Sequence, residues 1–124
     1  MTALPVRSSI EEDTLESAVI EELATFGEDF LAQLVDQFLR ETDVLLGELR
    51  TARETGDHAA AGRIAHSLKG SSSQIGGRRL ALSCNELEAN ATSPEGLSER
   101  EDDLHDVEKS YDELRRALTR RCVS

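Results

Sequence analysis

Three residues at helical spacing, His66, Lys69 and Gly70, have the side chains that a phosphoryl-accepting site requires. A neutral imidazole is nucleophilic near pH 7, and a lysine one helical turn away could pair with the oxygens of a phosphate. Gly70 carries no side chain and would leave an open approach to the ring. A glycine inside a helix costs about 1 kcal/mol relative to alanine, so its place here favours a functional reason. The pattern predicts a histidine nucleophile for phosphate chemistry.

The helix that would carry these residues has one apolar face and one polar face. Small or apolar residues recur at steps of three and four and so share one side of a helix: Ala61, Ile64, Ala65, Leu68, Ser72 and Ile75. His66 lies about 200° around the helix from Ile64, at roughly 100° per residue, and should point to solvent. Arg63 and Ser73 fall on the same outer stripe, where the Ser73 hydroxyl could bind a phosphate oxygen.

The stretch from His66 to Ser72 reads His-Ser-Leu-Lys-Gly-Ser-Ser, with Gly76 ending the following turn. It resembles the phosphorylation motif of histidine-containing phosphotransfer (Hpt) domains. The likeness covers nearly the whole chain. Residues 30–49 resemble the long helix before the histidine helix, and the helix after it is similar at Leu80, Cys84, Leu87 and Glu88. The His-x-x-Lys-Gly core inside a four-helix pattern is a fairly specific signature.

The resemblance implies a role for each residue of the motif. His66 would accept a phosphoryl group through Nε2 from an aspartyl phosphate on a receiver domain, and the transfer would be reversible. Lys69 would pair with the phosphoryl oxygens as a point charge, and Gly70 would leave room for the partner. The expected partners are response regulator receiver domains and a hybrid histidine kinase.

The chain lacks the parts that an autonomous kinase needs. It contains no Gly-x-x-x-x-Gly-Lys loop for nucleotide phosphates. The Mg²⁺ and most of the catalytic machinery would therefore come from the receiver, and no cofactor of the chain's own is expected. We predict a phosphoryl carrier and not an enzyme in its own right.

Charge is distributed unevenly along the 124 residues. With 14 basic and 25 acidic residues the formal net charge is −11, which argues against nucleic acid as a partner. No acid lies between Asp57 and Glu86, whereas this interval contains four bases, Arg63, Lys69, Arg78 and Arg79. We interpret them as a basic island around His66 and predict that Arg63, Ser73, Arg78 and Arg79 contact the partner. Chance clustering of four bases is the alternative.

The spacing of the cysteines bears on metal binding, and the hydropathy of the chain bears on its cellular location. Cys84 and Cys122 have no zinc-like spacing, so we predict two free thiols in a reducing cytoplasm and no metal site. The chain shows no signal peptide and no apolar run near the roughly 20 residues that span a bilayer. We expect a cytoplasmic protein without membrane contact.

Five helices and no strands are expected. Residues 1–8 should be a flexible tail and residues 9–124 one Hpt-like domain. The first predicted helix begins at a capping box at Ser9 or a few residues later, and the next three begin at Glu28, after Asp57 and at Arg78. The last predicted helix begins after a second capping box at Ser98. Gly76 is predicted to be left-handed. The predicted fold class is all-α, an antiparallel up-and-down four-helix bundle with a short N-terminal capping helix.

Two other functions fit parts of the pattern. A non-catalytic interaction module would use the same helical face but would have no need for His66. The dimerisation half of a histidine kinase would place its histidine in a two-helix hairpin that requires a second chain, whereas four helices in one chain predict a monomer. His58, His105, Asn85 and Glu88 are assigned no role.

Overall fold

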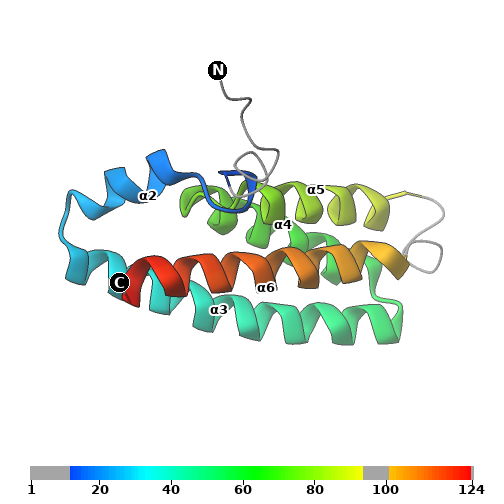
Figure 1. Ribbon diagram of the computed structural model, residues 1–124. Coiled ribbons are helices and arrows are strands. Elements are labelled where there is room, and N and C mark those ends of the chain that lie inside the picture. Colours follow the sequence, from blue (N-terminus) through cyan, green and yellow to red (C-terminus); the bar gives the residue numbers. More distant parts are fainter. Residues whose placement is uncertain (1–11, 94–100, 124) are drawn as a thin grey trace, which may run out of the picture.

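The described part of the chain is helical. The structure is a computed structural model that describes residues 12–93 and 101–123, and within these ranges there is no strand (Figure 1). The helices are α2 (Ser17–Ala24), α3 (Glu28–Thr55), α4 (His58–Gln74), α5 (Arg78–Ala91) and α6 (Glu101–Val123). The all-α prediction is confirmed.

The core lies where the four longer helices meet. Helix α4 packs most extensively against α5, α5 packs against α6, and α3 packs against both α4 and α6. Each of the four contributes fully buried leucines, among them Leu31 and Leu49 from α3, Leu68 from α4, Leu80 and Leu87 from α5, and Leu114 and Leu118 from α6. Each such burial contributes about 1.5–3 kcal/mol. The four longer helices of one chain therefore pack around a common core.

The two ends of α4 follow the predicted capping residues. The carboxylate of Asp57 accepts a hydrogen bond from the backbone N–H of Ala60, with 3.1 Å between nitrogen and Oδ1. After the helix, Gly76 has φ +86°, the left-handed conformation that favours glycine. The next residue, Gly77, is closely packed, because a Cβ there would lie 2.5 Å from Cδ2 of Leu114. The tight turn brings α5 back along α4.

Replacing Asp57 with alanine should lower the free energy of unfolding by about 1 kcal/mol, because the first turn of α4 would lose its cap. Asp57→Asn keeps a capping oxygen and should stay close to the wild type. Urea unfolding followed by circular dichroism measures the difference. Equal stability of the alanine and asparagine variants would contradict the capping role.

Helix α2 lies at the end of the molecule where α6 finishes (Figure 1). Arg121 near the end of α6 forms ion pairs with Glu21 of α2 and Glu28 of α3, each with a nitrogen–oxygen distance of 3.0 Å. The backbone N–H of Glu16 donates to the carbonyl of Gly76, at 2.8 Å. These contacts fasten α2 to α3, to α6 and to the turn after α4.

The predicted first helix is interrupted at Leu15 and Glu16. Residues 12–14 form a short helical turn, Glu16 is extended, and α2 starts at Ser17. The carboxylate of Glu12 accepts hydrogen bonds from the Ser17 backbone N–H at 3.0 Å and from its hydroxyl at 3.1 Å. This side chain reaches across five residues, a contact that hydrophobic periodicity does not reveal. The tail at 1–8 and the residues Ser9 and Ser98 lie outside the described residues.

Cys84 is buried, Cys122 is partly buried, and both are free thiols, as predicted. Among the described residues no helix is both long and apolar enough to cross a lipid bilayer.

Candidate functional site

His66 projects from the solvent face of α4, as the helical spacing predicted. Its side chain is 68% exposed, whereas Ala65 and Leu68, on either side of it in the sequence, are fully buried. The buried face fixes the rotation of the helix about its axis. The ring is thus held outward by a rigid element.

A carboxylate on the neighbouring helix contacts the ring. Nδ1 of His66 lies 2.9 Å from Oε2 of Glu88, which comes from α5. The ammonium of Lys69 donates to Oε1 of the same carboxylate at 3.0 Å and to Oδ1 of Asn85 at 3.2 Å. One carboxylate of α5, that of Glu88, therefore contacts both His66 and Lys69 of α4. Sequence reasoning assigned no role to Glu88 or Asn85.

The Glu88 carboxyl is stabilised in its ionised form. The hydrogen bond from Lys69 is the main cause that lowers its pKa, the contact with His66 lowers it further, and partial burial opposes both. Glu88 is consequently a carboxylate at neutral pH. The side chains of Lys69 and Glu88 are 32% and 27% exposed, so their ion pair is only partly screened by water.

Gly70 is exposed and has open space above it. A Cβ built on this residue would meet no heavy atom within 4 Å, so the packing of the described residues does not explain the glycine. Arg63 and Ser73 are also exposed on α4, as predicted. Ser71 and Ser72 donate their hydroxyls to carbonyls of the same helix, Ser72 to that of Leu68 at 2.6 Å.

Arg78 and Arg79 lie away from the ring. They begin α5, and Glu88 follows Arg78 by ten residues, about 15 Å along a helix at a rise of 1.5 Å per residue. Arg78 lies 4.0 Å from Asp13, and Nε of the partly buried Arg79 has no hydrogen-bond partner within the described ranges. The acid-free interval in the sequence is therefore not an acid-free surface, since Glu88 lies directly against His66.

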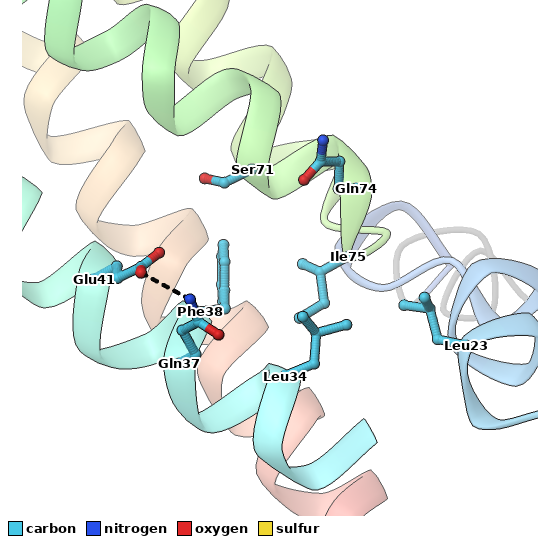
Figure 2. A pocket seen from close by; sticks show the side chains of 8 residues that line it. All are labelled: Leu23, Leu34, Gln37, Phe38, Glu41, Ser71, Gln74 and Ile75. Atoms are coloured by element: carbon cyan, nitrogen blue, oxygen red, sulfur yellow. Dashed lines mark hydrogen bonds between the residues drawn. The ribbon is translucent and has the colours of Figure 1, made fainter. Parts of the chain in front are cut away.

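A groove between α3 and α4 opens on the other side of the histidine helix from Glu88. Figure 2 shows it lined by Leu23, Leu34, Phe38 and Ile75, with Gln37, Glu41, Ser71 and Gln74 as its polar residues. Its volume is about 460 Å³. Ser71 and Gln74 follow His66 by five and eight residues on α4.

A group of three or more histidine, cysteine or acidic side chains that could hold a metal ion does not occur among the residues that the structure describes. Glu88 forms its contacts with an imidazole and an ammonium instead.

Comparison with known proteins identifies the family. The Hpt domain family model matches residues 33–120. The fold superposes on the crystal structure of histidine-containing phosphotransfer protein B (HptB) from Pseudomonas aeruginosa PAO1 with a TM-score of 0.82 and 30% sequence identity, over 88% of this chain and 94% of that chain. A comparison with curated proteins gave no match. Since the family model spans well over half of the chain, this protein belongs to the Hpt domain family and is a histidine phosphotransfer protein of phosphorelays.

Proposed function

We propose that His66 is the residue that carries the phosphoryl group, taking it from an aspartyl phosphate on one receiver domain and giving it to an aspartate on another. The observation that carries this proposal is the exposed ring of His66 on a helix whose opposite face is buried in the core. Nδ1 contacts Glu88, while Nε2 makes no hydrogen bond within the described part of the chain. Nε2 is the nitrogen available to an incoming phosphorus atom.

Alignment and charge stabilisation are the main catalytic requirements, because the transferring group is close to a metaphosphate. In this proposal the receiver supplies Mg²⁺ and most of the catalytic groups, and this chain supplies the nucleophile. Lys69 would turn one of its N–H groups toward the phosphoryl oxygens while Glu88 and Asn85 hold its other contacts. Gly70 would admit the receiver surface. The protein acts as a carrier that depends on its partners for turnover.

We further propose that α3 to α6 form an antiparallel up-and-down bundle, with α2 as the cap, and that the protein works as a monomer. All four long helices contribute to one buried core within a single chain. This arrangement supports the carrier over the dimerisation half of a histidine kinase, which needs a second chain to bury its hairpin. Light scattering that finds an obligate dimer would count against the monomer.

The test of the function uses the whole protein and a panel of purified receiver domains. Each receiver is first phosphorylated with labelled acetyl phosphate, freed of excess donor, and mixed with the chain. We expect acid-labile label to move to the chain within minutes from at least one receiver, and to return when unlabelled receiver is added. A chain that takes no label from any receiver would contradict the proposal.

Receiver association should depend on the charge of Arg63, which is exposed one turn before His66. Arg63→Glu should slow association several-fold at low salt and less at high salt, because salt screens interactions between exposed charges. Stopped-flow kinetics across a salt series measure this dependence. Lys109→Glu makes the same change of charge on an exposed position of α6 and is the matched control.

The same stopped-flow salt series can show whether the receiver also contacts the start of α5. Arg78→Glu combined with Arg79→Glu should resemble the Arg63 variant if the receiver covers the start of α5. If the pair behaves like the Lys109 control, these two arginines do not contact the receiver. A salt profile identical for Arg63→Glu and Lys109→Glu would remove Arg63 from the docking surface.

A further inference from the structure

A hollow beside His66 opens between α4 and α5, and its volume is about 510 Å³. The residues that line it are His58, Ala59, Gly62, Arg63, His66, Glu88, Ala91 and Thr92. His66 is part of its wall, whereas the groove of Figure 2 is lined by later residues of α4. A closed cavity of about 150 Å³ can hold a benzene ring, so this open hollow has room for a side chain of another protein.

The base of the hollow is apolar because the buried residues there are small. Gly62 is buried, and Ala91 is only 6% exposed. A Cβ built on Gly62 would lie 3.7 Å from the Cβ of Ala91 and 4.0 Å from the Cγ2 methyl of Thr92. The hydroxyl of Thr92 donates to the carbonyl of Ala89 at 2.9 Å, so the polar group of this threonine bonds within its own segment. An apolar group fits best against such a base, because a polar group buried there would lose its hydrogen bonds to water.

We propose that this hollow receives an apolar side chain of the receiver domain during phosphotransfer, and that the small side chain of Ala59 helps to determine which receivers fit. This inference rests on the proposed role of His66 as the phosphorylated residue. A receiver that brings its aspartyl phosphate to the ring also comes against the hollow, because the ring belongs to its wall. The hollow therefore continues the surface on which the receiver must dock.

The positions along α4 limit which receiver side chain can enter. Ala59 and His66 are seven residues apart, which places them on one face of the helix and about 10 Å apart along its axis. Arg63 is exposed between them and also lines the hollow. Its cation is thus at the entrance, where it would attract an anionic aspartyl phosphate. The entering side chain should stand within about 10 Å of the phosphorylated aspartate of the receiver.

The competing explanation is that the hollow is only the space left where two helices approach closely. Gly62 and Ala91 agree with that explanation, because long side chains between them would push α4 away from α5. Ala59 does not depend on it. It is exposed, so a larger side chain there would extend into the hollow without separating the helices. A substitution of Ala59 therefore separates the two explanations.

The experiment compares the full chain with Ala59→Phe, Ala59→Leu and Ala89→Phe. Ala89 is an exposed alanine inside α5 that does not line the hollow, and it serves as the matched control. Both phenylalanine variants place the same side chain at an exposed helical position, so their cost in helix propensity is similar. Circular dichroism confirms that each variant remains folded.

Transfer is measured against the concentration of a labelled receiver that serves the wild type. Ala59→Phe should raise the receiver concentration at half-maximal transfer on the order of 10–100-fold, because the phenyl ring takes the space of the receiver side chain. The rate at saturating receiver should fall less, since His66 and Lys69 are unchanged. Ala59→Leu should have a smaller effect than Ala59→Phe, and Ala89→Phe should resemble the wild type.

Methyl resonances of Ala59, Ala91 and Thr92 supply the second readout. They are recorded on the wild type while unphosphorylated receivers are added one at a time, so they do not depend on transfer. We expect all three to shift with at least one receiver. A shift that depends on the concentration of the chain alone would identify a second copy of the chain as the occupant and would overturn the proposal.

Two further results would overturn the role of the hollow: methyl groups that no receiver shifts, or an Ala59→Phe variant with the concentration dependence of the wild type. The proposed function can still stand in both cases, provided that the wild type takes phosphate. A wild type that takes no phosphate while a receiver shifts these methyl groups would contradict the proposed function and support the hollow as a docking site.

Discussion

Replacing His66 with glutamine should abolish phosphoryl acceptance completely. Glutamine has no nucleophilic ring nitrogen, and no other described side chain takes the same place on α4. The substitution should cost little stability, because the position is 68% exposed, glutamine forms helices well, and exposed changes usually stay within about 0.5 kcal/mol. The side-chain amide can also donate a hydrogen bond to Glu88. Loss of label would therefore report lost chemistry and not a lost fold.

The measurement is label retained on the chain after mixing with a phosphorylated receiver, followed by acid treatment to release phosphohistidine. His105→Gln is the matched control, because His105 is an exposed histidine on α6 that is distant in sequence from the motif. It should accept label as the wild type does. Label on His66→Gln at the wild-type level would show that another residue is the acceptor.

The histidine helix could be predicted from sequence almost to the residue. Its buried face repeats at steps of three and four, and this one-sided pattern determines which way His66 points. Its ends depend on local chemistry, a carboxylate cap at Asp57 and a left-handed glycine at Gly76, and both act within a few residues. Local signals of this kind need no tertiary information.

The acidic half of the site depends on the pairing of two helices, which composition does not show. Counting along the sequence placed His66 in a window without acids, yet the chain turns at Gly76 and Gly77 and brings Glu88 back to it. A hairpin centred near residue 77 pairs positions that lie equally far on either side, as His66 and Glu88 do. The position of the predicted turn therefore determines which residues of α4 and α5 lie at the same level of the hairpin. The rotation of α5 that points Glu88 at α4 depends on packing.

The start of α2 shows the same limit at shorter range. The capping box and the apolar spacing predicted one helix from Ser9 or a few residues later, but the chain is extended at Glu16 and α2 starts at Ser17, whose N–H bonds the carboxylate of Glu12. The segment is also held by the bond from Glu16 to Gly76, sixty residues away in sequence. Contacts of this length compete with local propensity, and sequence patterns alone do not rank the two.

Gly70 is the second position where a substitution should have a large effect, because no packing contact among the described residues requires a glycine there. Its backbone is helical, and an added Cβ would touch no heavy atom within 4 Å. Gly70→Leu should therefore fold normally and gain up to about 1 kcal/mol in helix stability. Transfer should nevertheless fall on the order of 100-fold, because a side chain beside His66 would hold the receiver away, and a displacement of about 1 Å can have this effect.

Gly47→Leu is the matched control for this substitution. Gly47 is also inside a long helix, α3, and a Cβ there would likewise meet nothing within 4 Å. Both variants should gain similar stability in thermal unfolding, while only the Gly70 variant should lose transfer and receiver binding. Gly70→Ala should lie between wild type and Gly70→Leu, because a methyl group displaces the partner less. If Gly70→Leu transfers at the wild-type rate, the receiver does not approach His66 over this part of α4, and the open space above Gly70 has no part in docking.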